Sequence, residues 1–145
     1  MHPVWYYSYG RGRAIVIYIY KAELIRVVDG DTVELMIDQG FSDFTEQKMR
    51  LYGIDSPEMR TIAGKALTNA LRAQYPEGSK LAVQSIEGPK KKQFQDKYGR
   101  YLAIIYDEKP KNAREIANGQ KILEVAPTSL NARLITEGHA KERYW

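Results

Sequence analysis

The feature that most constrains the fold is a long run of β-forming residues that is broken once, by Asp-Gly-Asp. Residues 14–28, AIVIYIYKAELIRVV, are rich in Ile, Val and Tyr and predict one long strand or two consecutive strands. In residues 32–38, TVELMID, apolar and polar residues alternate, as in a strand with one buried face. Asp29, Gly30 and Asp31 are poor strand residues, so the chain is expected to turn tightly there, with Gly30 supplying a permissive backbone.

The rest of the chain predicts further short strands and two helices. Residues 48–54, KMRLYGI, form a third strand, which Pro57 brings to an end in a loop. Residues 62–75 carry Ala and Leu at helical spacing and predict an amphipathic helix. The remaining predicted elements are strands at residues 79–86 and 100–106 and a final helix that is capped by Thr128 or Ser129 and ends at Gly138.

About five short strands with a helix after the third predict a mainly β (α+β) fold, an OB-fold-like five-stranded β-barrel with packed helices. The length of 145 residues is that of one ordinary domain. Residues 107–128 contain ANGQ between REI and KILEV, which predicts an added hairpin that decorates the surface.

Composition excludes several kinds of site. The chain has no cysteine, which rules out disulfides, thiol nucleophiles and Cys-based zinc sites, and its two histidines, His2 and His139, are too far apart for a usual zinc set. The net charge of +4 suits a polyanionic partner where the positive charge is concentrated.

The apolar run AIVIYIY is far shorter than the roughly 20 residues of a membrane helix. It is not followed by a recognisable signal-peptide cleavage site, which favours a cytoplasmic chain, although a secreted chain already trimmed of its signal would look the same.

Two aspartates are placed where they could bind a metal ion. Asp31 follows a turn and Asp55 ends a strand, and strand ends are where loops gather into sites. Carboxylates without histidine or thiol indicate a hard cation, Ca²⁺ or Mg²⁺. An EF-hand loop counted from Asp29 fails, because its sixth position is Glu34 instead of glycine and its twelfth is Gly40 instead of glutamate. The simpler alternative is that each aspartate serves only its turn.

Other reactive side chains surround these aspartates in the sequence. Arg50 lies five residues before Asp55, and Glu58 lies three residues after it. Residues 90–100 hold five basic residues and one acidic residue with two aromatic rings between them, a pattern that suits a phosphate backbone and stacked bases. For residues 90–92, a solvated hairpin tip is an equal alternative.

Four motifs in this order, VVDGDTVEL, RLYGIDSPE, DKYGRYLAIIY and LNARLITEGHAK, resemble the staphylococcal nuclease (thermonuclease) family, whose fold is a five-stranded OB-type barrel with helices. The resemblance covers roughly residues 20–145. It implies an N-terminal extension at residues 1–19, an extra strand or a tail, and an insertion at about residues 107–128. The loop after Glu58 is shorter than in the family, which would widen access to the site or alter substrate preference.

The resemblance implies a role for each matching residue. The carboxylates of Asp31 and Asp55 and the backbone carbonyl of Ser56 would bind Ca²⁺; serine replaces the usual threonine there, which leaves the carbonyl available. Glu58 would be the general base. The other implied site residues are the phosphate-binding Arg50 and Arg100 and the nucleotide-binding Lys97, Tyr98 and Tyr144.

The implied function is a calcium-dependent endonuclease that hydrolyses phosphodiester bonds of DNA and RNA, single-stranded by preference, with little sugar or sequence specificity, and leaves 3′-phosphate ends. A monomer is the default expectation. The alternative is a catalytically inactive OB-type nucleic-acid-binding module, and a weaker one is a protein-interaction domain. Retention of the complete acid and arginine set favours the enzyme.

Overall fold

The computed structural model describes residues 4–10, 13–86, 95–111 and 113–144. The elements, in chain order, are β1 (Val4–Gly10), β2 (Arg13–Asp29), β3 (Thr32–Asp38), β4 (Phe44–Leu51), β5 (Ile54–Asp55), α1 (Ile62–Gln74), β6 (Lys80–Ser85), β7 (Tyr101–Tyr106), α2 (Ile122–Val125), α3 (Leu130–Thr136) and β8 (Lys141–Glu142).

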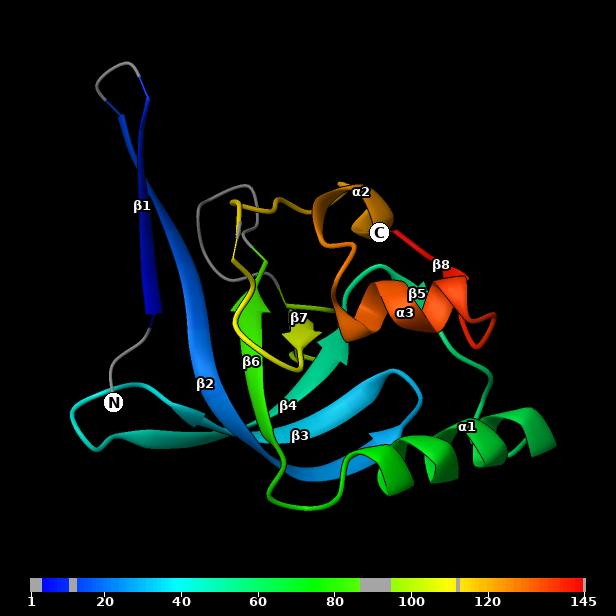
Figure 1. Cartoon of the computed structure of the whole chain (residues 1–145). Helices are drawn as coiled ribbons and strands as arrows, with labels where there is room; N and C mark the ends of the chain where they lie inside the picture. The colour runs from blue at the N-terminus through cyan, green and yellow to red at the C-terminus, as the bar shows by residue number, and fades with distance from the viewer. Residues whose placement is uncertain (1–3, 11–12, 87–94, 112, 145) are drawn as a thin grey trace.

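The main sheet closes on itself to form a barrel. Its strand order is β1-β2-β3-β4-β7-β6, and β2 also pairs with β6, so that β2, β3, β4, β7 and β6 form a ring (Figure 1). β4 and β7 run parallel, whereas the other neighbours in the ring are antiparallel. The predicted OB-fold-like barrel with packed helices is therefore confirmed. The short strands β5 and β8 form a second, two-stranded sheet.

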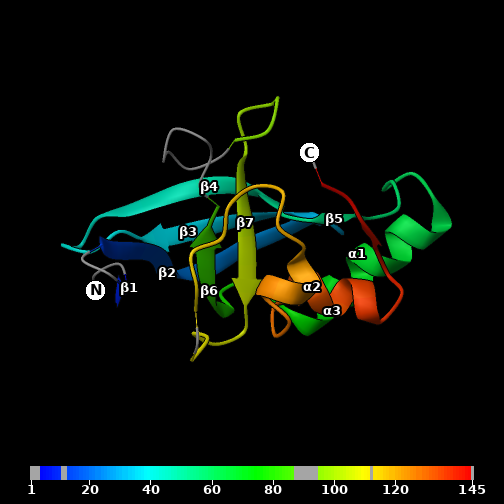
Figure 2. The ribbon, with the colours of Figure 1, turned by 90° about the horizontal axis from the view of Figure 1, so that it is seen from above.

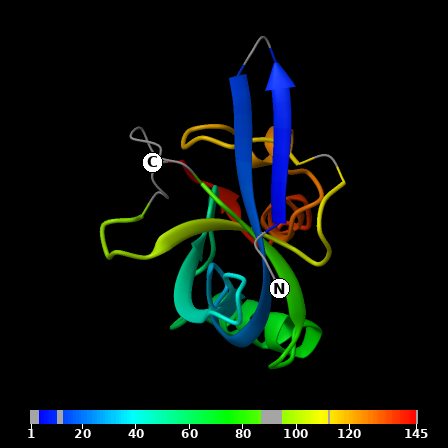
Figure 3. The same ribbon diagram turned by 90° about the vertical axis from the view of Figure 1, so that its left-hand side faces the viewer.

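β2 is a single strand of 17 residues, long enough to serve two parts of the molecule. Register shifts between Leu24 and Arg26 and between Val27 and Asp29 let it bend around the barrel. Its first part pairs with β1 in a hairpin that extends away from the barrel (Figure 3). The boundary expected between the N-terminal extension, residues 1–19, and the rest of the chain lies inside this strand, and Ile19 is fully buried.

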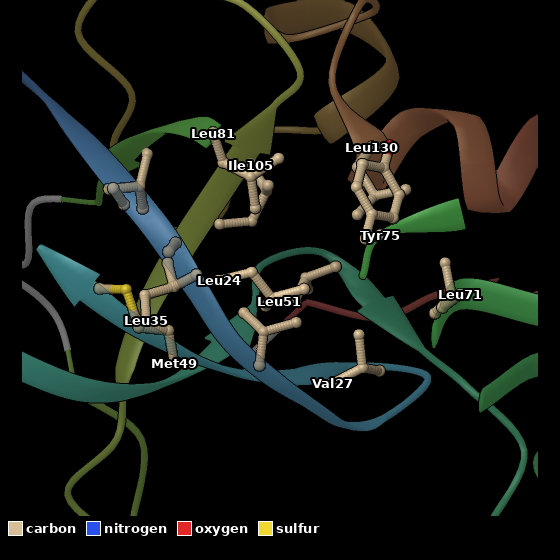
Figure 4. Close-up of a cluster of buried hydrophobic side chains, with 14 of the residues drawn as sticks. Leu24, Val27, Leu35, Met49, Leu51, Leu71, Tyr75, Leu81, Ile105 and Leu130 are labelled. Carbon is tan, nitrogen blue, oxygen red and sulfur yellow. The ribbon is translucent and has the colours of Figure 1, made fainter. Parts of the chain in front are cut away.

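The barrel interior is filled by alternate residues of its strands, as Figure 4 shows for Leu24, Leu35 and Ile105. Helix α1 packs against this core. The alanines whose spacing predicted the helix, at positions 63, 66 and 70, are exposed, and the buried face instead carries Leu67 and Leu71. The helical spacing therefore predicts the helix correctly, but the alanines that share this spacing lie on the solvent side of the helix.

Both faces of β7 are buried, which explains its continuous apolar sequence. Ala103 and Ile105 face the barrel core, whereas Leu102, Ile104 and Tyr106 belong to a second apolar cluster. The covering residues of this second cluster come from the segment after β7: Ile116, Ile122 and Ala126 are each at most 2% exposed.

The hairpin predicted for residues 107–128 is therefore wrong. ANGQ forms a turn, and the following residues form helix α2 instead of a strand, beside α3 in Figure 2. The segment is also not surface decoration, because it covers the outer face of β7. The third strand differs as well: β4 begins at Phe44, earlier than expected, and ends at Leu51, after which Gly53 turns the chain with a φ of 79° into β5.

The last predicted helix is confirmed as α3, with Ser129 as its N-cap: the Ser129 side chain accepts a hydrogen bond from the N–H of Ala132. Inside α3, the buried side chain of Asn131 joins the helix to the barrel. Its amide group donates to the carbonyl oxygens of Tyr52 at 2.9 Å and Ala103 at 3.0 Å and accepts from the N–H of Ile105 at 3.0 Å.

Asn131→Ala is expected to lower the free energy of unfolding by about 3 kcal/mol, because buried backbone groups lose their partners together with the packing of the side chain. Urea unfolding followed by circular dichroism measures this change. The matched control is Asn69→Ala, on the exposed side of α1, which should change stability by less than about 0.5 kcal/mol. Equal effects for the two variants would contradict the bridging role.

A second polar connection joins the end of α1 to α3. Tyr75 donates to a carboxylate oxygen of Asp107, and the guanidinium of Arg133 donates to the Tyr75 hydroxyl. Burial, together with the neighbouring Asp107, raises the pKa of Tyr75 to about 12.

Stability is expected to fall as the pH rises from about 10 to about 12. In this window the unfolded chain releases the tyrosine proton and the folded chain keeps it, so the unfolded state is favoured. Burial raises the pKa of Tyr106 to about 12 as well, which adds to the loss. Urea unfolding at pH 9 and pH 11 should show a smaller decrease for Tyr75→Phe than for the wild type. Tyr98→Phe, at an exposed tyrosine, should decrease as the wild type does.

Candidate functional site

The strand register brings distant residues to one end of the barrel. Thr32, which follows Asp31 at the start of β3, pairs with Arg50 near the end of β4, and Arg50 pairs in turn with Leu102 of β7. The turn after β4 then leads into β5, which ends at Asp55. Residues from three separate segments therefore meet where these strands begin or end.

The guanidinium of Arg50 lies at the centre of this end of the barrel. It is 5% exposed, and its two terminal nitrogens lie 3.1 Å from Oδ2 of Asp31 and 3.4 Å from Oδ1 of Asp55. It also donates to backbone carbonyl oxygens, with the shortest contact of 3.0 Å to Ile54. Burial lowers the pKa of Arg50, and the two carboxylates oppose that shift. The two predicted metal-ligand side chains therefore point toward a common position that carries positive charge.

Asp29 and Asp31 form an interacting carboxyl pair. Asp29 accepts a hydrogen bond from the Asp31 N–H at 3.0 Å, which is the turn role expected of it. Burial and then the hydrogen bond with Asp31 raise the pKa of Asp29. Burial also acts to raise the pKa of Asp31, but its hydrogen bond with Asp29 and the charge of Arg50 outweigh it, so that this pKa is lowered. Asp31 is therefore the member of the pair that favours the anionic form.

Gly30 is required in this turn for a reason that the sequence did not indicate. Its φ is not in the left-handed region, so the expected conformational role is wrong. A Cβ at this position would lie 2.6 Å from Cδ2 of Leu67 and 2.8 Å from Cβ of Ser56. Gly30 thus allows α1 and the loop after β5 to approach the turn closely.

The loop between β5 and α1 is held at both ends. The Ser56 N–H donates to Oδ2 of Asp31 at 3.2 Å, and the Thr61 hydroxyl donates to the carbonyl oxygen of Glu58 at 2.7 Å. The side chain of Glu58 is 66% exposed and forms an ion pair with Arg60. The backbone of the expected general base is fixed, whereas its carboxylate extends into solvent.

Arg100 approaches the same site from the turn before β7. Its Nε donates to Oδ2 of Asp96 at 2.8 Å, and one terminal nitrogen donates to the Thr32 hydroxyl at 3.2 Å. Tyr98 is 72% exposed, with Lys97 Nζ 5.1 Å and Arg100 Cζ 5.4 Å from the centre of its ring. The predicted phosphate-binding and nucleotide-binding residues of this turn therefore form one cationic and aromatic group.

Tyr144 lies two residues after the end of β8. Its hydroxyl accepts a hydrogen bond from the Ile122 N–H at 2.9 Å, and its ring lies edge-on to Tyr52. The predicted role in nucleotide binding remains a prediction. The neighbouring Arg143 was not expected in the site: one of its terminal nitrogens lies 3.4 Å from Oδ2 of Asp55. A second basic residue, two positions after Lys141, was the sequence signal for it.

The donor set suits a hard cation, although the described part of the chain contains no group of three or more His, Cys, Asp or Glu side chains placed to hold a metal ion. Asp31 and Asp55 already hold one cationic group between them, the guanidinium of Arg50. With the carbonyl of Ser56 they would supply only oxygen ligands, which are those of Ca²⁺ and Mg²⁺.

Comparison with known proteins shows the family of the chain. The model of the staphylococcal nuclease homologue family matches residues 48–145, a range that includes Arg50, Asp55, Glu58 and Arg100. The chain belongs to this family. It is 31% identical over 86 residues to a protein named thermonuclease from Staphylococcus hyicus, and the aligned region is 58% of this chain and 47% of that protein. The chain thus spans about half the length of that relative.

The family match begins after Asp31, which the barrel register and the ion pair with Arg50 bring to this end of the barrel. Among the described residues, no helix is long and apolar enough to cross a membrane.

Gly30→Ala is expected to lower the free energy of unfolding by about 2 kcal/mol through overcrowding. Leu67 contributes only the flexible end of its side chain to the clash, whereas Ser56 contributes its Cβ, so Ser56→Gly should partly rescue the Gly30→Ala variant. Urea unfolding of both single variants and the double variant measures the coupling. Strictly additive effects would show that the close approach of Gly30 and Ser56 is unimportant.

Proposed function

We propose that this chain is a metal-dependent nuclease that hydrolyses phosphodiester bonds of nucleic acids. The observation that carries the proposal is the arrangement at the end of the barrel. Two carboxylates hold the Arg50 guanidinium. Burial is the largest cause of the lowered pKa of Arg50, and the nearby charge of Arg100 lowers this pKa further. Two like charges held together in this way favour an anion between them.

The residues present divide into groups with different tasks. Asp31, Asp55 and the Ser56 carbonyl would hold Ca²⁺, whose irregular, partly hydrated shell suits a small number of protein ligands. When bound, the cation would supply Lewis-acid stabilisation of charge on the phosphate. Arg50 and Arg100 would bind the phosphate oxygens, because the planar guanidinium matches phosphate and remains charged near neutral pH.

Glu58 would orient and deprotonate the attacking water. Its exposed carboxylate, at the edge of the site, is accessible to solvent. The transition state of the reaction is more highly charged than the bound ester, so two guanidiniums stabilise it more than the ground state. Attack that leaves a 3′-phosphate is the outcome that family membership favours.

Single-stranded DNA and RNA are the proposed substrates. The exposed ring of Tyr98, with two cationic groups beside it, offers a surface on which an unpaired base can stack. The guanidiniums of the site can bind phosphate oxygens whatever the base, and phosphate contacts carry no sequence information, so little sequence specificity is expected.

The decisive experiment measures cleavage of a single-stranded DNA and an RNA of the same sequence, with Ca²⁺ and with chelator. Asp55→Asn should abolish or strongly reduce cleavage, and chelator should do the same to the wild type. Glu58→Gln should lower kcat by roughly 10²- to 10⁴-fold with little change in KM. Glu77→Gln, at an exposed glutamate after α1, is the matched control and should retain activity.

Binding of both nucleic acids by folded wild-type protein, without cleavage in any divalent cation, would contradict the proposal. It would support the alternative of an inactive OB-type binding module. Full activity of wild type in Mg²⁺ without Ca²⁺ would leave the nuclease in place and overturn the calcium assignment.

A further inference from the structure

The carboxylate of Asp55 is held by two arginines on its two oxygens. Arg50 lies 3.4 Å from Oδ1, on the barrel side, and Arg143 lies 3.4 Å from Oδ2. Arg50 is buried, whereas the side chain of Arg143 is 56% exposed. A third guanidinium, besides those of Arg50 and Arg100, therefore lies next to the proposed phosphate site, on the solvent side of Asp55.

The backbone around Arg143 is fixed to the strand that carries Asp55. β8 pairs with β5 through Ile54 with Glu142 and Asp55 with Lys141, and the Arg143 N–H donates to the carbonyl oxygen of Gly53 at 3.0 Å. Residues two apart on an extended chain share a face, so Lys141, which pairs with Asp55, and Arg143, the residue after β8, lie on the same face as Asp55, roughly 7 Å apart along the chain. Lys141 of β8 and Arg143 just after it therefore place two basic residues beside the site.

The contact between Arg143 and Asp55 can be exchanged for another. Both side chains are about half exposed, and exposed ion pairs contribute little to stability because water competes for both charges. A phosphate oxygen offers the guanidinium an equally good or better partner, since Arg binds phosphate through two parallel hydrogen bonds.

We propose that Arg143, with Lys141 beside it, forms a subsite for the phosphate adjacent to the scissile phosphodiester. This inference rests on the nuclease function proposed above, which places the scissile phosphate at Arg50 and Arg100. Arg50 is buried and Arg143 is exposed on the other oxygen of Asp55, which favours contact of Arg143 with a neighbouring phosphate over contact with the scissile one. The ligand is thus an oligonucleotide with at least two backbone phosphates.

The first test compares substrates of different length. A dinucleotide with one phosphodiester and no terminal phosphate has no group for this subsite, whereas a longer single-stranded DNA does. Arg143→Ala should lower kcat/KM about tenfold for the longer DNA and leave the dinucleotide nearly unchanged. The matched control is Arg26→Ala: Arg26 is 54% exposed and, like Arg143, pairs with a carboxylate, that of Glu34. This control should affect neither substrate.

The second test does not depend on cleavage. Binding of the same DNA is measured in chelator by fluorescence anisotropy at several salt concentrations. Loss of one phosphate contact should reduce the slope of log K against log salt by about 0.7 for Arg143→Ala, with a similar change for Lys141→Ala. Arg143→Lys should keep the wild-type slope, because the charge remains. Its kcat/KM for the longer DNA should fall between those of the wild type and Arg143→Ala, because lysine lacks the planar guanidinium.

An equal loss of kcat/KM on both substrates, with an unchanged salt slope, would overturn the inference, because Arg143 would then act only by positioning Asp55. If the wild type cleaves neither substrate but Arg143→Ala still reduces the salt slope of binding, the phosphate subsite would be supported and the nuclease function would be overturned. The two failures are therefore distinguishable.

Discussion

The buried guanidinium of Arg50 joins the parts of the chain that make the site. A cation at 5% exposure is costly unless its charge and all its donors are satisfied. Asp31 and Asp55 supply the opposite charge, and the carbonyl oxygens of Asp31, Leu51 and Ile54 accept further hydrogen bonds. The β2–β3 turn, the end of β4 and β5 are thereby held around one group. Two carboxylates are brought close together because the arginine between them requires it.

This arrangement needs close backbone approaches, which glycine permits. Gly30 packs directly against the side chain of Ser56, and Gly64 in the first turn of α1 leaves room for the carbonyl oxygen of Glu58. The short loop between β5 and α1 is therefore packed against the helix, while the side chain of Glu58 remains outside this packing, paired with the exposed Arg60. Of the candidate site residues, Arg50 is thus restrained on every side, whereas Glu58 is restrained mainly through its backbone.

Local patterns in the sequence were sufficient for most of the barrel. Strand alternation, the Asp-Gly-Asp turn and the Ser129 cap depend on neighbouring residues, and the structure contains all three. The features that were missed depend on residues distant in the sequence. Burial of Ile122 requires the outer face of β7, and the need for glycine at position 30 is set by Ser56 and Leu67. Arg143 enters the site only because β8 pairs with β5.

The charges of the site explain why a cation and an anion would assist each other there. The guanidinium of Arg50 contacts the carboxylates of Asp31 and Asp55, and that of Arg143 contacts the carboxylate of Asp55. Carboxylate oxygens that held a divalent cation would compensate less of the guanidinium charge and would leave an excess of positive charge there. A phosphate can replace the lost carboxylate contacts. Within the proposed function, each ligand therefore strengthens the binding of the other, and by linkage this effect is reciprocal.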